Sequence, residues 1–239
     1  MTAAQLAAVA SLLADRSRAA ICMALLDGRA WTVGELARQA GIAPSTASEH
    51  VARLVDAGLL AAVQQGRHRY VRLADARTAQ FVEDLAAYAT PASAPDPRAA
   101  PRSLRAVSTA QALARARTCY DHLAGRLGVR ITDALTDSGV LDQTNGLTLT
   151  KTGIAWLESA LDVDVAALRA SRRPLVRSCL DWTERRPHLG GAAGAAICDR
   201  FLTKGWIARV GTGRAVRVSP AGQQALRDIC GIDSADDVT

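Results

Sequence analysis

Residues 32–58 read TVGELARQAGIAPSTASEHVARLVDAG, and this stretch predicts two short helices joined by a tight turn. Thr32 and Glu35 have the spacing of a capping box, in which each side chain bonds the backbone N–H of the other residue. Apolar residues then recur at i, i+3, i+4 and i+7, as on one buried helical face: Val33, Leu36, Ala37 and Ala40. Gly41 predicts the end of this helix, because glycine takes a positive φ easily.

The second helix is predicted to start at Pro44, whose fixed φ suits a first helical position, and to stop at Gly58. Its apolar face consists of Ala47, Val51, Leu54 and Val55. Its other face carries Ser45, Thr46, Ser48, Glu49, His50 and Arg53. Small hydroxyls at a helix start can bond phosphates, and longer polar side chains one turn on can reach base edges in a major groove. The pair of helices is therefore predicted to be a DNA-binding helix-turn-helix.

A basic hairpin is predicted directly after this unit. Residues 59–64 form a β-like run, 65–67 a turn, and 68–73 a second run in which polar and apolar residues alternate. Arg67 and Arg69 are expected to contact flanking phosphates or the minor groove. The hairpin therefore has the character of the wing of a winged helix.

The sequences IAPSTASEHVARLVDAGLL (42–60) and QQGRHRYVRL (64–73) resemble the ArsR/SmtB type of winged-helix transcriptional repressor. The resemblance covers roughly residues 5–90 and implies a homodimer that presents two recognition helices to double-stranded DNA at a pseudo-palindromic operator. It also implies repression by occupation of a promoter. The alternative is a winged helix that only dimerises or binds another protein.

Composition sets wider limits on the chain. Its 239 residues suffice for one large or two modest domains, and its net charge of +6 permits nucleic-acid binding. Residues 1–89 carry nine basic and eight acidic side chains, so net charge does not single out this segment. The sequence has five cysteines but no close CxxC pair, and it shows no signal-peptide pattern and no long apolar run. These features favour a cytoplasmic protein without membrane contact.

Further helices are expected on both sides of the helix-turn-helix. Residues 3–14 and 17–26 precede it, and the second of these offers apolar side chains to the core: Ile21, Cys22, Leu25 and Leu26. A helix over 75–89 follows the wing and carries Phe81, Leu85 and Tyr88 on one stripe. A dimer would remove this apolar stripe from water.

The fold class predicted is mainly α with short β-hairpins, in two domains. Residues 1–90 form the winged helix-turn-helix, 91–103 a Pro/Ala-rich linker, and 104–239 a C-terminal effector domain. In that domain Arg117-Thr-Cys119-Tyr-Asp121 resembles Arg177-Ser-Cys179-Leu-Asp181, which predicts two degenerate winged-helix-like repeats at about 104–168 and 174–232. Each repeat is predicted to contain a long helix, a second helix, a hairpin and a closing helix: 109–127, 131–137, 140–149 and 153–161, then 175–186, 192–203, 206–218 and 221–230.

Four side chains of the repeats are candidates for a soft-metal or thiol-reactive site: Cys119, His122, Cys179 and His188. Cys119 and His122 are three apart on the predicted long helix, so they would share a face. The alternative is that the cysteines only fill the core. This chain lacks the metal-binding patterns usual in the resembled family. The first helix of its helix-turn-helix has no cysteine, and its helix after the wing has no histidine.

Two other features of the C-terminal domain have competing interpretations. Residues 190–194, GGAAG, suggest a nucleotide-binding loop and a methyltransferase-like enzyme, but no strand is predicted before them, so close packing of the helix start is favoured. Four aromatic side chains either line a pocket for a small apolar effector or fill the core: Tyr120, Trp156, Trp182 and Trp206. We therefore predict a regulator that is not an enzyme and requires no cofactor.

Overall fold

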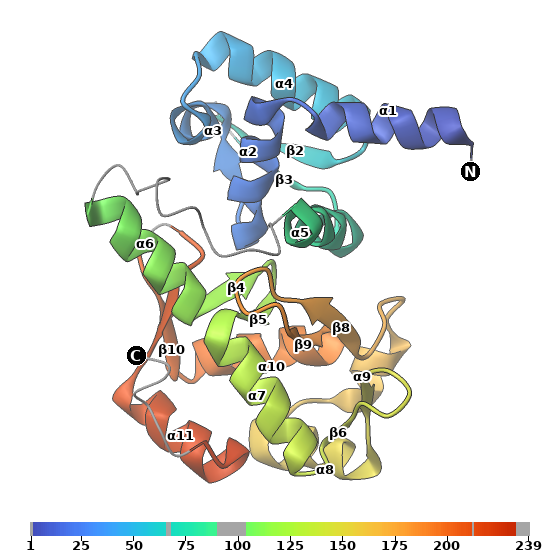
Figure 1. The fold of residues 1–239 in the computed structure, drawn as a ribbon, viewed down its shortest axis with the longest axis vertical. Helices are drawn as coiled ribbons and strands as arrows, with labels where there is room; N and C mark the ends of the chain where they lie inside the picture. Colours follow the sequence, from blue (N-terminus) through green and yellow to red (C-terminus); the bar gives the residue numbers. More distant parts are fainter. Residues whose placement is uncertain (1, 66–67, 90–103, 212, 233–239) are drawn as a thin grey trace. The chain divides into compact units, whose positions relative to one another are not determined.

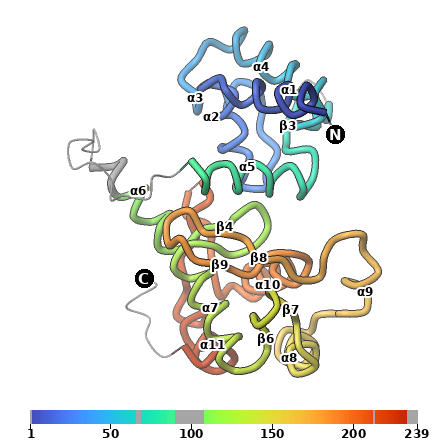
Figure 2. Tube along the Cα trace, turned by 45° about the vertical axis from the view of Figure 1, so that its right-hand side comes forward, coloured from blue at the N-terminus to red at the C-terminus, as the bar shows by residue number. Residues whose placement is uncertain are grey.

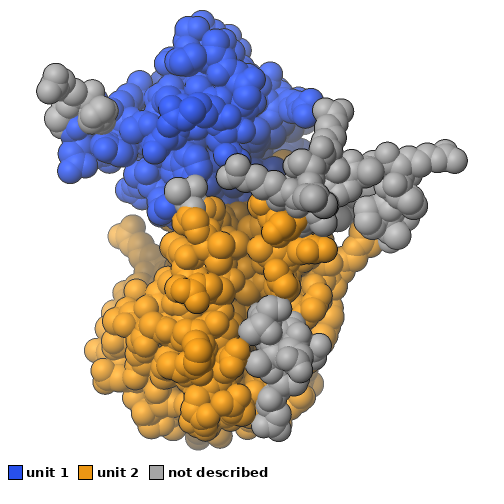
Figure 3. All heavy atoms as spheres, turned by 90° about the vertical axis from the view of Figure 1, so that its left-hand side faces the viewer, with its two compact units in different colours: residues 1–83 blue, residues 84–239 orange. Residues whose placement is uncertain are grey.

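The computed structural model describes residues 2–65, 68–89, 104–211 and 213–232. The chain divides into two compact units, residues 1–83 and 84–239, which are coloured separately in Figure 3. The boundary between the units falls inside the helix Ala76–Ala89. The predicted linker at 91–103 lies outside the described residues. Within the described residues, no helix is long and apolar enough to cross a membrane.

Unit 1 has the element order of a winged helix (Figure 1). Its elements are α1 (Ala3–Leu13), α2 (Arg16–Ala24), the 3-10 turn η1 (Leu25–Asp27), β1 (Trp31–Thr32), α3 (Val33–Ala40), α4 (Pro44–Asp56), β2 (Leu60–Gln65), β3 (His68–Leu73) and α5 (Ala76–Ala89). The three strands form an antiparallel sheet in the order β1-β3-β2. The predicted helix-turn-helix and wing are both confirmed.

Local capping sets the limits of α3. The Glu35 N–H donates to the Thr32 hydroxyl at 3.3 Å, and the Thr32 N–H donates to the Glu35 carboxylate at 2.8 Å. Gly41 ends the helix at a φ of 68°, in the left-handed region that favours glycine. The next helix, α4, begins with Pro44. The capping box and both helix boundaries are therefore as predicted.

The core of unit 1 lies between α2, α3, α4 and the sheet. Its fully buried side chains include Ile21, Cys22, Leu25, Leu26, Leu36, Ala47, Val51, Leu54 and Val71. Cys22 is therefore a core residue, as predicted. Val55, predicted on the buried face of α4, is only half-buried.

Apolar side chains remain exposed on α1 and on α5, the helix that continues from unit 1 into unit 2. α1 buries none of its residues, and its Leu6 is 60% exposed. On α5, Leu85 is 43% and Tyr88 90% exposed, whereas Phe81 is half-buried. These two helices therefore leave apolar surface available to a partner.

Unit 2 begins within α5 and contains two successive sets of hairpin, helix, hairpin and helix (Figure 2). After α6 (Leu104–Arg115), the first set is β4 (Arg117–Cys119), β5 (His122–Ala124), α7 (Gly125–Asp137), β6 (Leu141–Asp142), β7 (Thr148–Leu149) and α8 (Lys151–Leu161). After α9 (Val165–Ala170), the second is β8 (Arg177–Leu180), β9 (Pro187–Gly190), α10 (Gly191–Thr203), β10 (Ile207–Arg209), β11 (Val216–Val218) and α11 (Pro220–Cys230).

The two long helices predicted at 109–127 and 175–186 are wrong, because the first range contains the whole hairpin β4-β5 and the second contains strand β8. β4 pairs with β5 in a register that sets Cys119 opposite His122, and β8 pairs with β9 so that Cys179 faces His188. The first hairpin turns through Tyr120 and Asp121, and Tyr120 takes a φ of 58° without being glycine. A two-residue turn of this composition lacks the Asn-Gly type of signal by which hairpins are found in sequences.

Equivalent glycines allow the closing helix of each set to pack against its hairpin. A Cβ on Gly153 of α8 would lie 2.2 Å from the Val140 carbonyl oxygen. A Cβ on Gly222 of α11 would lie 1.9 Å from the Trp206 carbonyl oxygen. Both distances are far shorter than atoms tolerate, so only glycine fits here without backbone movement.

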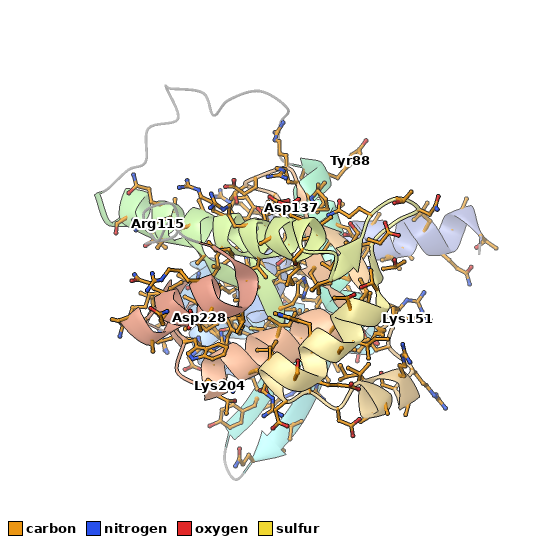
Figure 4. All side chains as sticks on the ribbon, turned by 90° about the horizontal axis from the view of Figure 1, so that it is seen from below. Tyr88, Arg115, Asp137, Lys151, Lys204 and Asp228 are labelled. Atoms are coloured by element: carbon orange, nitrogen blue, oxygen red, sulfur yellow. The ribbon has the colours of Figure 1, made fainter. Side chains whose placement is uncertain are left out.

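One continuous apolar core fills unit 2. Its most deeply buried members come from helices of both sets: Leu127, Leu135, Leu157, Leu161, Ala193 and Phe201. Charged side chains such as Lys151, Lys204 and Asp228 extend outward from these helices (Figure 4). The two sets therefore form a single folded body rather than two independent ones.

The close approach at Gly222 yields a stability prediction. Gly222→Ala should lower the free energy of unfolding by about 2 kcal/mol or more, because the added methyl group meets the Trp206 backbone. Urea unfolding of the full chain measures this difference. Gly213→Ala is the control, since a Cβ at this position would meet nothing within 4 Å, and it should change stability by less than about 0.5 kcal/mol. Equal stability of the two variants would contradict the packing argument.

Candidate functional site

The outer face of α4 carries most of the polar side chains predicted to contact DNA. Ser45, Ser48, Glu49 and Arg53 are exposed, and Thr46 is half-buried. The Ser48 hydroxyl donates to the Pro44 carbonyl at 2.9 Å, within the same helix. α4 is held from the opposite face by the buried Ala47, Val51 and Leu54. The helix therefore presents short polar groups near its N-terminus and a cation further along.

His50 differs from the other predicted contact residues of α4. It lies three positions after Ala47 and four before Leu54, on the edge of the buried face. Its side chain is 14% exposed, and its Nε2 lies 3.7 Å from the Asp15 carboxylate at the start of α2. The structure therefore directs His50 toward α2.

The wing supplies further cations. Arg69 is exposed on β3 and stands opposite Gln64 of β2. Arg72 on the same strand is also exposed, although it was not among the predicted contact residues. Arg67 lies outside the described residues.

The second candidate site is in unit 2, where two hairpins bring together the four predicted cysteine and histidine residues. Cys119 and His122 are cross-strand partners in the hairpin β4-β5, and Cys179 and His188 are cross-strand partners in β8-β9. Figures 1 and 2 both show these hairpins side by side. The prediction that these four residues meet is confirmed, but the placement of Cys119 and His122 on one helix was wrong.

The four side chains form a compact buried cluster, which we call the Cys/His cluster. Their ligand atoms all lie within 4.8 Å of one another, and all four residues are buried. The two Sγ atoms are 3.7 Å apart, and the two imidazole rings stack with centroids 5.1 Å apart. Thiolate and imidazole are ligands for zinc and other soft or borderline metals. The cluster could therefore hold a metal ion.

Each histidine of the cluster has a carboxylate beside its Nδ1. His122 Nδ1 lies 3.3 Å from Asp121 Oδ1, and Asp121 is in turn paired with Arg173. His188 Nδ1 lies 3.9 Å from Asp181 Oδ2, and Asp181 is paired with Arg117 at 2.9 Å. Both aspartates belong to the repeated motif seen in the sequence, so the signal for their role was present there.

The surroundings of the cluster alter the pKa of its groups. Cys119, followed by the two histidine rings, holds the pKa of the Cys179 thiol far below its usual value, against the effect of burial. Burial alone would lower the pKa of His122, but Asp121 and the Cys179 sulfur raise it to about 9. Without a metal, the cluster thus favours a thiolate beside an imidazolium.

The remaining cysteines have a different environment. Burial raises the pKa of Cys22, Cys198 and Cys230 to about 12. These three thiols therefore behave as core residues, whereas Cys179 carries the features of a ligand or a reactive thiol.

The four aromatic residues proposed for a pocket each have separate surroundings. Trp156 donates to the Ile229 carbonyl at 2.9 Å, and Trp182 lies under the Arg117 guanidinium at 4.6 Å. Trp206 packs edge-on against Phe201, and Tyr120 occupies a hairpin turn. Among the described contacts, none joins one of the four to another.

The glycine-rich segment 190–194 begins at Gly190, the last residue of strand β9, and continues into α10, so the expectation that no strand precedes it was wrong. Its glycines are used for packing. A Cβ on Gly194 would lie 2.4 Å from the Leu189 carbonyl oxygen, and one on Gly190 would lie 3.2 Å from His122 Nε2. Contact with the protein's own atoms therefore explains these glycines, in agreement with the interpretation favoured from the sequence.

Comparison with known proteins gives matches over the winged helix and over the whole chain. The helix-turn-helix domain family matches residues 13–63. YdfF of Bacillus subtilis, described as an uncharacterized HTH-type transcriptional regulator, is 40% identical over 222 residues, which cover 92% of this chain and 95% of YdfF. The HTH-type transcriptional regulator CmtR of Mycobacterium tuberculosis is 38% identical over 80 residues, or 34% of this chain and 67% of CmtR. An NMR structure described as the cadmium metal-sensor CMTR from that organism covers 41% of this chain and 99% of its own, at 31% identity and a TM-score of 0.30.

The buried pair of Arg117 and Asp181 beside the cluster yields a prediction about stability and pH. Burial would raise the pKa of Asp181, but Arg117 and the hydrogen bonds from Thr183, Glu184 and Gly125 lower it from 3.8 to about 2. A carboxylate with a depressed pKa stabilises the fold above its unfolded pKa, so about 2 kcal/mol should be lost as pH falls from about 4 to 2. Urea unfolding at a series of pH values measures this loss.

Asp181→Asn should lack this part of the pH dependence and should be about 3–5 kcal/mol less stable at neutral pH, because Arg117 remains buried without its partner charge. The control Asp228→Asn, at an exposed carboxylate on α11, should stay within about 0.5 kcal/mol of the wild type. A wild-type stability that is flat between pH 4 and 2 would contradict the assignment.

Proposed function

The chain belongs to the ArsR/SmtB family of helix-turn-helix transcriptional regulators, and on this premise we propose that it is a homodimeric repressor of a pseudo-palindromic operator. The observation that carries the proposal is the exposed polar face of α4 beside a wing with exposed arginines. A two-fold axis would present two copies of α4 to successive major grooves. Repression follows if the dimer occupies a promoter.

Contacts to DNA divide into two kinds in this proposal. Ser45, Thr46 and Ser48 approach the phosphate backbone at the start of α4, while Glu49 and Arg53 reach base edges one turn further on. Arg69 of the wing, with the neighbouring Arg67, binds flanking phosphates or the minor groove. Because His50 faces α2, its role is to help place α4 rather than to contact a base.

Dimerisation is proposed to use α1 and α5. These helices carry the exposed apolar side chains Leu6, Val9, Leu85 and Tyr88. Burial of apolar surface contributes about 25 cal/mol per Å² and is the main favourable term in association. A dimer through these helices would leave α4 and the wing open to DNA.

Unit 2 is proposed to be the effector domain, with residues 1–90 as the DNA-binding and dimerisation domain. The order hairpin, helix, hairpin, helix occurs twice in unit 2, which supports two degenerate winged-helix-like repeats. An effector bound to this unit would release DNA if it favours a dimer with a different half-site spacing.

The DNA-binding role predicts different effects for two arginines. Arg69→Ala should weaken binding to all DNA sequences and reduce the slope of log affinity against log salt by about one unit, because it removes one phosphate contact. Arg53→Ala should instead reduce the preference for the operator over other sequences, by about 1–3 kcal/mol. Fluorescence anisotropy with operator and random duplexes at several salt concentrations measures both effects.

The charge-matched control is Arg169→Ala, at an exposed arginine of α9. It should change neither the salt dependence of DNA binding nor the preference for the operator. Wild-type affinity and selectivity in both test variants would favour a winged helix that binds protein instead of DNA.

The dimer interface gives a second prediction. A fragment of residues 1–92 should be folded and dimeric at micromolar concentration, because it contains α1, α5 and the whole winged helix. Tyr88→Glu should raise the dissociation constant of the dimer by more than about tenfold, since it places a charge in an apolar interface. Sedimentation equilibrium measures the constant.

Val63→Glu is the matched control, because this exposed apolar side chain lies on the wing and should not affect dimerisation. A monomeric fragment would mean that dimerisation depends on the C-terminal half of the chain.

A further inference from the structure

We propose that Cys119, His122, Cys179 and His188 bind one four-coordinate metal ion of the zinc class, which joins the hairpins β4-β5 and β8-β9 of unit 2. The inference rests on the geometry and chemistry of the Cys/His cluster. It concerns unit 2 alone and does not depend on DNA binding by unit 1.

The distances in the cluster fit a tetrahedral ion. Zinc–sulfur bonds are about 2.3 Å long, which puts two thiolates of a tetrahedron about 3.8 Å apart. The observed separation of Cys119 Sγ and Cys179 Sγ is 3.7 Å. All four ligand atoms lie within 4.8 Å of one another, so small side-chain adjustments bring them around a common centre.

The imidazole nitrogens of the cluster need partners. His122 Nε2 and His188 Nε2 are buried and accept or donate no hydrogen bond within the described part of the chain. A buried nitrogen without a partner costs free energy, because it has lost its hydrogen bonds to water. Coordination of both Nε2 atoms to one ion would supply the missing interaction.

The charges of the cluster also balance with a divalent ion. Two thiolates and two neutral imidazoles carry a total charge of −2, which a +2 ion cancels inside a buried site. Two sulfur and two nitrogen ligands suit zinc and its heavier relative cadmium, whereas magnesium and calcium require oxygen ligands. Four protein ligands leave no open coordination position, so the site is of the closed kind that stabilises a fold.

A carboxylate orients one of the two histidines directly. Asp121 Oδ1 lies 3.3 Å from His122 Nδ1, which fixes the tautomer that leaves His122 Nε2 free to bind metal. Asp181 Oδ2 lies 3.9 Å from His188 Nδ1, too far for a hydrogen bond, so Asp181 acts there only as a nearby negative charge. Among the described residues, the Cys/His cluster is the one group of three or more cysteine, histidine or acidic side chains that lie close enough together to hold a metal ion.

The test measures metal binding by the full chain under reducing conditions. The protein is stripped with a chelator, reconstituted with Zn²⁺ and passed through a desalting column, and its zinc is then determined. One zinc per chain is expected for the wild type and for the matched control Cys198→Ser, whose thiol lies in the apolar core. Cys119→Ser and Cys179→Ser should each weaken Zn²⁺ binding at least about 100-fold in a chelator competition, and Asp121→Asn about 10- to 100-fold.

A variant that keeps four metal ligands distinguishes loss of a ligand from loss of the fold. His188→Cys should still bind one Co²⁺ per chain with the absorption bands of tetrahedral Co²⁺, but with stronger thiolate-to-cobalt charge transfer than the wild type. Zn²⁺ should also raise the thermal midpoint of the wild-type protein, and this increase should be absent from Cys119→Ser and present in Cys198→Ser.

Three outcomes would overturn the proposal. The first is substoichiometric zinc in the reconstituted wild type. The second is equal Zn²⁺ affinity in the cluster variants and Cys198→Ser, which indicates binding elsewhere. The third is a Co²⁺ spectrum of His188→Cys that does not differ from that of the wild type.

Discussion

The ion pair between Arg117 and Asp181 is the interaction on which the arrangement of unit 2 depends. Both side chains are buried, so the pair is tolerable only because further groups satisfy the carboxylate. Asp181 accepts hydrogen bonds from the backbone N–H groups of Gly125, at 2.6 Å, and of Thr183, at 2.8 Å. One carboxylate thus joins the strand β4, the start of α7 and the turn after β8. Because β4 ends in Cys119 and β8 contains Cys179, this contact also fixes the two sulfurs near each other.

The fold of unit 1 could be predicted from the sequence because its signals are local. Thr32, Glu35, Gly41 and Pro44 determine helix limits through contacts within a few residues, and structure and sequence agree there. The hairpins β4-β5 and β8-β9 of unit 2 could not be predicted in the same way, since the turn at Tyr120 and Asp121 has no glycine or asparagine. The other two hairpins of unit 2, β6-β7 and β10-β11, do lie within the ranges predicted for hairpins, 140–149 and 206–218. The four members of the Cys/His cluster were still identified, because Cys119 and Cys179 occupy equivalent positions of a repeated motif and each has a histidine within nine residues. Asp121 and Asp181 belong to the same motif, but their contacts with Arg173 and Arg117 span 52 and 64 residues, so the sequence did not reveal these pairs.

Placement of charge, rather than its amount, distinguishes the proposed DNA-binding surface. Residues 1–89 have nearly equal numbers of basic and acidic side chains, so no strong general attraction to DNA arises from this segment. Three of its exposed arginines, Arg53 of α4 and Arg69 and Arg72 of β3, stand where a groove and its phosphates would be reached together. The position of His50 shows the limit of counting polar residues on a helix. A polar side chain at the edge of the buried stripe can serve packing, and only the tertiary contact with Asp15 reveals this.

The two halves of the Cys/His cluster are similar in sequence but unequal in their exposure to water. On the His188 side, the side chains are almost completely buried: His188 and Arg117 are each 1% exposed, and Asp181 is 0% exposed. On the His122 side, Asp121 is 30% and Arg173 28% exposed. Water therefore reaches the carboxylate beside His122 but not the one beside His188. The Asp121 carboxylate is paired with Arg173, so an arginine–carboxylate pair stands beside each histidine, one open to water and one closed to it.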